Sequence, residues 1–243
     1  MPQIFQIVPA ILSCVLLVSG CHAAGNGPGA AISGYWKDKT LLEEDIRVSQ
    51  NLFADFAEIA ANAPSEEAEA ALGLLFDRLK AEDEVAYYIY SEWMEGAFYN
   101  PYSSCRNVGL FTYAVDRIVS DGVMNPDEYA PMMQKKEWMN INKEGEPAIL
   151  PQADTLGRNT LVLVLDLSCP SCREALTRLR EKPEWNDARR LAICCGDGSV
   201  PEVPGWEYQT MKDHEAVFDI KMTPIYYVID GSGIVIQSYT PAL

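Results

Sequence analysis

The sequence predicts an α+β chain in two parts, an N-terminal helical bundle followed by an α/β domain with a mixed sheet. A change of pattern along the chain supports this fold class. Between about residues 40 and 140, apolar residues recur at the three-, four- or seven-residue spacing of amphipathic helices. After residue 142 they occur instead in short runs divided by turns, which is typical of buried strands.

The composition is that of a globular protein and not of a nucleic-acid-binding one. The 243 residues are 48% hydrophobic and 22% charged, which suits one large domain or two small ones. Because there are 19 basic and 35 acidic side chains, the formal net charge is −16. A chain of this charge repels phosphate backbones, so we expect no nucleic-acid partner.

The first residues have the pattern of an export signal. An apolar run from Ile4 to Val18 precedes the first charged side chain, Lys37, and is shorter than the roughly 20 residues that a spanning helix needs. The run ends in Val18-Ser19-Gly20-Cys21, which resembles a bacterial lipobox. The resemblance implies that residues 1–21 are a lipoprotein signal peptide with Cys21 as the lipidation site. A plain cleaved signal with an incidental cysteine is the alternative.

The lipobox resemblance also implies a location. We expect the protein to be lipid-anchored in the cell envelope, to face the periplasm and to reach the membrane through the lipid on Cys21. Small and glycine-rich residues follow this cysteine, so residues 22–38 are predicted to be a flexible tether.

Residues 39–142 are predicted to form the helical bundle, with proline and asparagine at several helix boundaries. Pro64 ends the first helix, and Ser65 followed by two glutamates supplies the cap and acidic first turn of the second. Asn100-Pro101 breaks the chain after the third helix. The predicted helices cover about residues 42–60, 65–79, 82–97, 108–119 and 126–138.

Residues 143–243 are predicted to form the α/β domain. A strand leads through Cys-Pro-Ser-Cys into a helix, and a second strand and a hairpin closed at Asp230-Gly231 follow. This order is that of a βαβ unit followed by two antiparallel strands. The predicted strands are residues 161–167, 191–195, 225–229 and 234–236.

Two separated motifs in this half resemble the thioredoxin superfamily. Residues 159–176 hold Cys169-Pro170-Ser171-Cys172 between a buried strand and a helix, and residues 222–233 hold Thr223-Pro224 before a strand and an Asp-Gly turn. The match covers roughly residues 144 to 239. It implies a thioredoxin-like fold in which a cis Thr223–Pro224 bond packs against the cysteine pair.

The helix N-terminus suggests different roles for the two cysteines. Cys169 leads the helix, where free N–H groups and the helix dipole favour a thiolate, so it is the predicted nucleophile. Pro170 suits the first helical turn because its φ is already helical. Cys172 lies deeper but within reach, so it is the predicted resolving cysteine, which attacks a mixed disulfide formed at Cys169. The resemblance implies that Pro170, Ser171, Thr223 and Pro224 contact the substrate.

The expected activity is thiol–disulfide exchange on protein or peptide cysteines, without a cofactor or metal. One departure concerns the position six residues before Cys169, where thioredoxin has a buried carboxylate and this chain has Leu163; the nearest acid is Asp166. This departure favours the alternative, a non-catalytic binding or scaffold lipoprotein with a structural Cys169–Cys172 disulfide. A copper or zinc site would need histidine ligands that the motif lacks.

The helical part is similar to an uncharacterised domain that precedes the thioredoxin-like domain in a family of Gram-negative lipoproteins. The residues that carry this similarity are Tyr35-Trp36, the segment 99–107 and the segment 142–147. The similarity assigns no biochemical role to the domain. A structural loop around Arg106 is the simpler interpretation of the segment 99–107, and a ligand site is the alternative.

Several other residues have a structural and a functional interpretation. Cys194 and Cys195 lie on alternate faces of a predicted strand, either as small buried residues or as a relay disulfide for the main pair. His214 has no second histidine nearby for a metal site. Aromatic residues between 87 and 102 are expected in the core rather than in a ligand cage. The role of Cys105 stays open.

Overall fold

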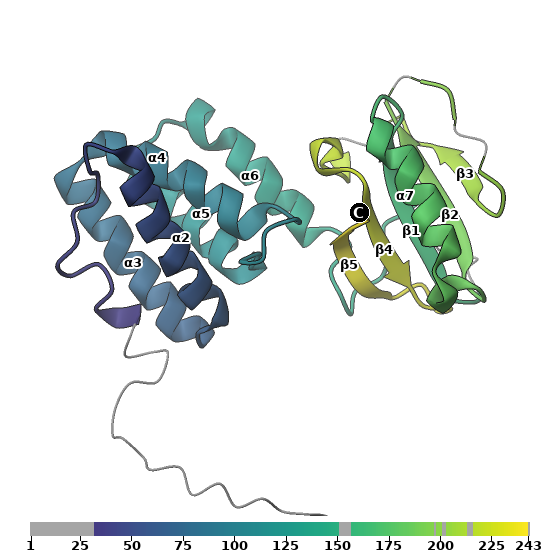
Figure 1. Ribbon diagram of the computed structural model, residues 1–243, viewed down its shortest axis with the longest axis horizontal. Coiled ribbons are helices and arrows are strands. Elements are labelled where there is room, and N and C mark those ends of the chain that lie inside the picture. Colours follow the sequence, from purple (N-terminus) through teal and green to yellow (C-terminus); the bar gives the residue numbers. More distant parts are fainter. Residues whose placement is uncertain (1–31, 151–156, 197, 201–202, 213–215, 243) are drawn as a thin grey trace, which may run out of the picture.

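The structure is a computed structural model, which describes residues 32–150, 157–196, 198–200, 203–212 and 216–242. A helical region, residues 32–142, is followed by a sheet region, residues 143–242 (Figure 1). The predicted signal peptide with Cys21 lies outside the described residues, as does His214. In the part of the chain that is described, no helix is long and apolar enough to cross a membrane.

The helical region confirms the predicted helices, with shifts at their ends. Side-chain caps explain where several helices begin, because Asp45 accepts from the Arg47 amide and Asn107 from the Leu110 amide, each at 3.1 Å. Asn125 and Glu128 form a full capping box. The helices are α2 (Ile46–Asn62), α3 (Ser65–Glu82), α4 (Glu84–Met94), α5 (Val108–Asp121) and α6 (Pro126–Asn140).

One predicted cap is wrong. Ser65 is the first residue of α3 and Pro64 occupies the cap position, without a side-chain hydrogen bond to the helix. The Ser65 hydroxyl instead donates to the Glu69 carboxylate, at 2.9 Å. Proline can precede the helix here because the first amides of a helix have no partner within it.

A π-turn, η1 (Glu95–Tyr99), follows α4 and buries both Phe98 and Tyr99. The segment that returns from it to α5, residues 100–107, is called here the 100–107 loop. Its end is tied to the π-turn because the Asn107 amide donates to the Phe98 carbonyl, at 3.0 Å. Wider turns of this kind shift the register of the residues after them.

The sheet region holds a mixed sheet in the order β3-β2-β1-β4-β5. Strands β1, β2 and β3 are parallel to one another, whereas β4 is antiparallel to both β1 and β5. All four predicted strands are present, and β3 was not predicted because Glu-Tyr-Gln-Thr contains no apolar run. The strands are β1 (Thr160–Asp166), β2 (Arg189–Cys195), β3 (Glu207–Thr210), β4 (Ile225–Ile229) and β5 (Val235–Pro241).

Each face of the sheet has its own core, because successive side chains of a strand point to opposite faces. Helix α7 (Pro170–Glu181) covers one face, where it buries the β1 residues Leu161, Leu163 and Leu165 (Figure 1). Val162 and Val164 point to the other face and belong to a core that continues into the helical region. The two regions therefore share one buried cluster.

Polar contacts also join the two regions. The buried Tyr99 hydroxyl donates to the Asp219 carboxylate at 2.9 Å and is hydrogen-bonded to the Tyr239 hydroxyl at 2.9 Å. The Arg106 guanidinium lies over the Tyr239 ring, 5.2 Å from its centroid. The segment 99–107 thus packs against the sheet region, in agreement with the structural interpretation of Arg106.

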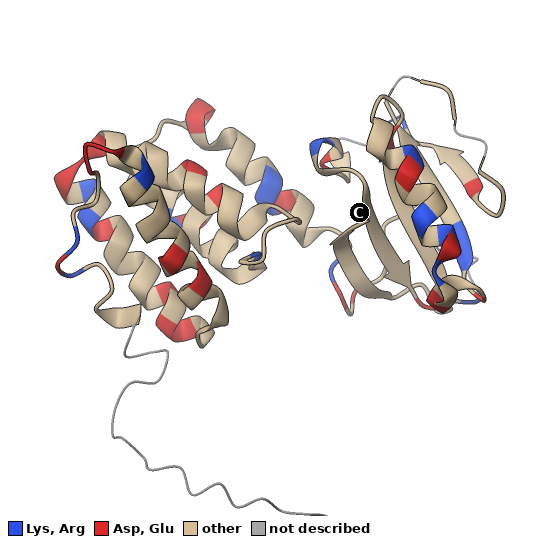
Figure 2. Cartoon of the chain, viewed as in Figure 1, with Lys and Arg blue, Asp and Glu red and all other residues tan. Residues whose placement is uncertain are grey.

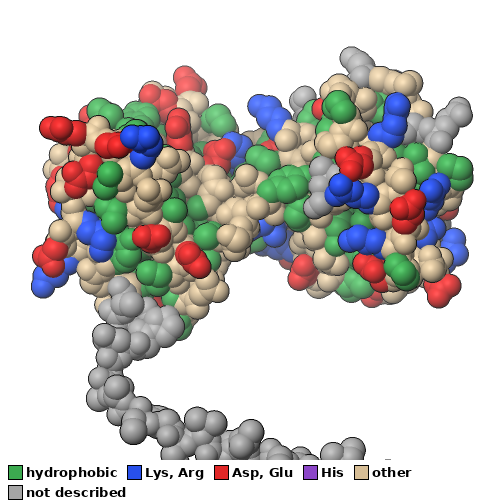
Figure 3. All heavy atoms as spheres, viewed as in Figure 1, with side chains coloured by type: hydrophobic (Ala, Val, Ile, Leu, Met, Phe, Trp, Pro, Cys, Tyr) green, Lys and Arg blue, Asp and Glu red, His purple; other side chains and the backbone are tan. Residues whose placement is uncertain are grey.

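Charged side chains are spread over the surface without forming one large patch of either sign on the face shown in Figure 3. Acidic residues are frequent on the helical region, whereas both signs occur along α7 (Figure 2). On α7, Arg178 and Glu174 form an ion pair at 2.6 Å. On the face shown in Figure 3, the described residues form no large basic patch of the kind that binds polyanions.

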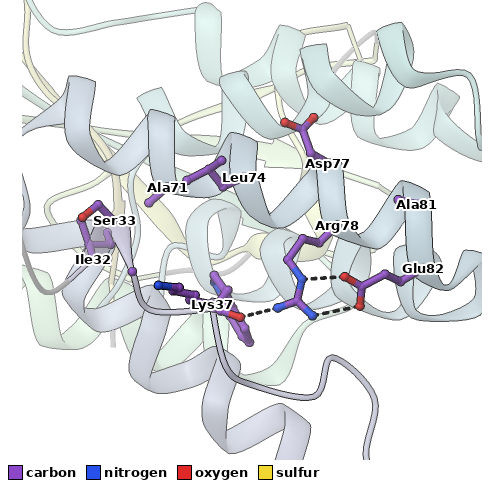
Figure 4. A pocket seen from close by; sticks show the side chains of 11 residues that line it. Ile32, Ser33, Lys37, Ala71, Leu74, Asp77, Arg78, Ala81 and Glu82 are labelled. Carbon is purple, nitrogen blue, oxygen red and sulfur yellow. Dashed lines mark hydrogen bonds and ion pairs between the residues drawn. The ribbon is translucent and has the colours of Figure 1, made fainter.

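The described part of the predicted tether is packed, so the prediction of flexibility is wrong for residues 32–38. Ile32 is 1% exposed and Trp36 is 4% exposed. Figure 4 shows Arg78 of α3 bound to the Glu82 carboxylate, beside a pocket of about 390 Å³. The Arg78 guanidinium also donates to the Trp36 carbonyl. An aromatic and an aliphatic side chain bury enough apolar surface to order this segment.

Candidate thiol site

The site begins at a tight turn between β1 and α7. The Asp166 carboxylate accepts hydrogen bonds from the Ser168 amide and hydroxyl, each at 2.8 Å. The Cys169 amide donates to the Asp166 carbonyl, at 3.0 Å. Pro170 is the first helical residue, as predicted, because its lack of an N–H costs nothing there. The turn leaves Cys169 at the N-cap of α7.

Cys169 is half-buried, and its surroundings favour the thiolate. Its sulfur lies 3.0 Å from the Ser171 hydroxyl. Burial by itself would raise the pKa of the Cys169 thiol, but the Ser171 hydroxyl, the Cys172 thiol and the backbone of both residues outweigh it and lower the pKa. A helix N-terminus acts in the same direction.

Cys172 has the opposite character. It is 2% exposed, and burial, followed by its hydrogen bond to Cys169, raises the pKa of its thiol to about 12. The two cysteines are free thiols in this structure. The pair therefore consists of an accessible, acidic thiol and a buried, protonated one.

The predicted cis bond between Thr223 and Pro224 is present. The short helix η5 (Ile220–Met222) leads into it, and the Thr223 hydroxyl donates to the Ile220 carbonyl at 2.7 Å. The Thr223 side chain also interacts with the Cys172 thiol and lowers its pKa, against the larger effect of burial. The start of β4 thus lies against the cysteine pair, as the sequence predicts.

A pocket of about 280 Å³ opens between the end of β1 and the start of α7. It is lined by Cys169, Pro170 and Cys172, together with Arg173 and the residues of the preceding turn. Among the described residues, no group of His, Cys, Asp or Glu could hold a metal ion. The reactive groups that line this pocket are the thiols of Cys169 and Cys172.

A carboxylate partner for Cys172 is missing among its described neighbours. Leu163 is fully buried beneath α7, at the position where thioredoxin has its acid. The Asp166 carboxylate is engaged by Ser168, and Cys172 meets the Asp166 backbone instead. Removal of the Cys172 proton therefore lacks a positioned carboxylate base.

Cys194 and Cys195 lie on opposite faces of β2, as predicted. Cys194 shares the α7 face with Cys172, and Cys195 belongs to the core shared with the helical region. Both are fully buried free thiols, and burial raises their pKa to about 11 and about 12, respectively. These properties favour the packing interpretation over a relay disulfide.

Most of the aromatic residues between 87 and 102 occupy the core, as predicted, and Tyr87, Tyr90 and Tyr99 are fully buried. Tyr102 differs, because it is 47% exposed and its hydroxyl donates to the Pro224 carbonyl at 3.1 Å. The sequence analysis missed its place at the thiol site. The available signal was its position after Asn100-Pro101, outside any helical periodicity.

Comparisons with known proteins support the fold. No family model matches the chain, and no curated protein matches its sequence. In structure, the chain is similar to a thioredoxin-like protein from Bacteroides caccae ATCC 43185, with a TM-score of 0.72 and 14% sequence identity. The match covers 99% of this chain and 96% of that chain, so it includes both regions. The chain is thus a helical region joined to an α/β domain with a thioredoxin-like fold.

Proposed function

We propose that this protein is a thiol–disulfide oxidoreductase that acts on cysteines of proteins or peptides. The observation that carries the proposal is the contrast between the two thiols at the start of α7. Cys169 is half-exposed with a lowered pKa, and Cys172 is buried with a pKa raised to about 12. Such a pair suits attack by one thiol and resolution by the other.

The proposed exchange has two steps. The Cys169 thiolate attacks one sulfur of a substrate disulfide, the substrate S–S bond breaks, and the leaving thiolate takes a proton from water. Cys172 then loses its proton and attacks the Cys169 sulfur, which breaks the mixed disulfide and releases the second substrate thiolate. The substrate gains two electrons and the Cys169–Cys172 pair becomes a disulfide. A second dithiol restores the pair, and the reversed steps oxidise a substrate dithiol.

The second step is expected to be the slower one. The Cys172 thiol has a raised pKa, and the Asp166 carboxylate is engaged by Ser168. Water is therefore the proposed acceptor of the Cys172 proton. The mixed disulfide at Cys169 should accumulate more than it would with a buried carboxylate near Cys172.

A single-turnover reaction tests the proposal. The full chain in its dithiol form should reduce one equivalent of a peptide disulfide and acquire one disulfide between Cys169 and Cys172, identified by mass spectrometry. Cys169→Ser should abolish the reaction. Cys105→Ser is the matched control, because Cys105 is also half-buried but lies in the helical region. A wild-type chain that consumes no disulfide would refute the proposal.

The second candidate is a binding or scaffold lipoprotein, and Leu163 in place of the buried acid favours it. In this candidate Cys169 and Cys172 form a structural disulfide, so Cys169→Ser should lower the stability of the fold and leave partner binding intact in the folded protein. The oxidoreductase predicts that Cys169→Ser abolishes thiol–disulfide exchange without a comparable loss of stability.

We also propose that the protein is exported and anchored in the cell envelope through a lipid on Cys21, facing the periplasm. The lipobox-like Val18-Ser19-Gly20-Cys21 supports this proposal. The wild-type protein should partition with membranes, and Cys21→Ser should release it or block its processing. A wild-type protein in the soluble fraction would favour the plain cleaved signal.

A further inference from the structure

We propose that the helical region supplies one wall of the substrate site, through the ring of Tyr102, and that this wall favours peptide cysteines with an apolar neighbour. The inference rests on the proposed function and names the substrate class. It assigns a role to the 100–107 loop, for which a structural loop was the simpler interpretation of the sequence and a ligand site the alternative.

The position of Tyr102 is set by contacts on both of its sides. Within the loop, the Asn100 carboxamide accepts from the Tyr102 amide at 2.9 Å, and the Ser103 amide donates to the Asn100 carbonyl at 3.0 Å. Across the two regions, the Tyr102 hydroxyl donates to the Pro224 carbonyl at 3.1 Å. Three residues earlier, the buried Tyr99 is held by Asp219 and Tyr239. The ring is thus fixed relative to the start of β4.

Tyr102 lies beside the thiols. Thr223 precedes Pro224 and interacts with Cys172, so the segment just before β4 contacts both Tyr102 and the resolving cysteine. Burial, followed by the charges of Cys172 and Cys169, raises the pKa of the Tyr102 phenol. The ring therefore lies on the Pro224 side of the cysteine pair, where we expect a substrate bound at Cys169 to pass.

The exposed part of Tyr102 determines what it can recognise. Its hydroxyl is occupied by the Pro224 carbonyl, while the side chain stays 47% exposed. What remains available is the apolar face of a rigid ring, which packs well against aliphatic or aromatic side chains. A peptide with such a residue next to its cysteine would bury that residue on the ring, whereas a small disulfide would gain nothing from it.

The test uses three probes with the full chain. Two are short peptides in mixed disulfide with a small polar aliphatic thiol, one with leucine and one with serine beside the cysteine, and the third is the symmetric disulfide of that polar thiol. We expect the wild type to show the lowest KM for the leucine peptide. Tyr102→Ala should raise that KM about five- to tenfold and change the other two by less than about twofold. Tyr102→Phe, which keeps the ring, should retain the preference.

Two further variants keep the test decisive. Tyr102→Gln retains a long side chain with a hydrogen-bond donor and should lose the leucine preference as Tyr102→Ala does. Tyr88→Ala is the matched control, since Tyr88 is a half-buried tyrosine of α4 whose hydroxyl bonds Glu128 within the helical region, and it should keep the preference.

The outcomes separate this inference from the proposed function. If the wild type reacts with all three probes but shows no leucine preference, or if Tyr102→Ala keeps that preference, the substrate-binding role of Tyr102 is refuted. The proposed oxidoreductase function is then unaffected. Equal loss on all three probes in Tyr102→Ala and Tyr102→Gln also refutes it, because Tyr102 would then only support the strand at Pro224. If the wild type reacts with none of the probes, both proposals fail.

Discussion

The sharpest prediction concerns the reactivity of the two thiols when each is left without the other. Cys172→Ser leaves Cys169 at the N-cap of α7, and Cys169→Ser leaves Cys172 buried beneath it. Each variant is treated with a small alkylating reagent at pH 7. We expect Cys169 to react at least about a hundredfold faster than Cys172.

The magnitude follows from ionisation. In the intact pair, burial and then the hydrogen bond to Cys169 raise the pKa of Cys172 to about 12, which corresponds to about one thiolate in 10⁵ molecules at pH 7, against about 3% for an ordinary thiol of pKa about 8.5. Cys169→Ser removes that hydrogen bond but keeps burial, the larger cause, so the pKa of Cys172 stays raised. Because the pKa of Cys169 is lowered, its thiolate fraction at pH 7 is at least that of an ordinary thiol. The more basic thiolate of Cys172 is intrinsically more nucleophilic by a factor of about 40, which reduces the advantage of Cys169 from more than a thousandfold to about a hundredfold. Burial of Cys172 restricts access and enlarges the difference.

The assay follows each alkylated peptide by mass spectrometry, with Cys105 as an internal half-buried thiol. The Cys169 rate should rise with pH around a midpoint below that of an ordinary thiol. Cys172→Ser should also trap peptide partners as mixed disulfides, and Cys169→Ser should trap few. Rates for Cys169 and Cys172 within about threefold of each other, or traps formed mainly through Cys172, would show that the nucleophile and resolving roles are wrongly assigned.

Three further predictions concern the packing around the site. Tyr99→Phe removes the bonds to Asp219 and Tyr239 and leaves an Asp219 side chain in a residue that is 2% exposed, so the free energy of unfolding should fall by about 1–3 kcal/mol in a urea titration. Tyr88→Phe, at a half-buried tyrosine, should cost less than about 0.5 kcal/mol, and equal losses would contradict the prediction. Gly198→Ala would place a Cβ 2.8 Å from the Leu167 Cβ, so it should shift the turn before Cys169 and change the Cys169 alkylation rate at least about threefold. The control is Gly34→Ala, whose Cβ would meet no atom within 4 Å and which should leave that rate unchanged. The buried thiols of Cys172, Cys194 and Cys195 have raised pKa values, so the folded state binds more protons than the unfolded state above about pH 8.5. Their contribution to the free energy of unfolding is complete below that pH and is lost as the pH rises toward 11–12. The melting temperature should therefore fall steadily between about pH 8 and about pH 10.5. A melting temperature that is constant over this range would argue against buried neutral thiols.

The elements of the sheet region could be predicted because their signals are local. The apolar run of β1, the Cys-Pro-Ser-Cys sequence and the Thr-Pro before β4 lie within short segments, and each limits the backbone by itself. Strand β3 could not be predicted, because its residues carry no apolar pattern and it exists through its pairing with β2.

The helical region shows the same division. Caps such as Asn125 and breakers such as Asn100-Pro101 act on their neighbours, so the helix order could be predicted from the chain. The packing of Ile32 and Trp36 could not, because the polar and small residues around them are typical of a tether. Their burial depends on distant helices, since the Trp36 ring packs against Phe56 of α2 and Tyr90 of α4, and its carbonyl accepts from Arg78 of α3.

By itself, the sequence determined the two-part fold class and the identity of the cysteine pair, since each depends on residues close together in the chain. That Thr223-Pro224 packs against the pair was implied by the resemblance to thioredoxins and not by a local pattern. Only the tertiary structure decided that the helical region reaches the thiol site. Tyr99 bonds Asp219 and Tyr102 bonds Pro224 across more than a hundred residues. The pKa difference between Cys169 and Cys172 likewise depends on what surrounds each sulfur. Burial and long-range hydrogen bonds arise when distant segments pack together, and no local pattern specifies them.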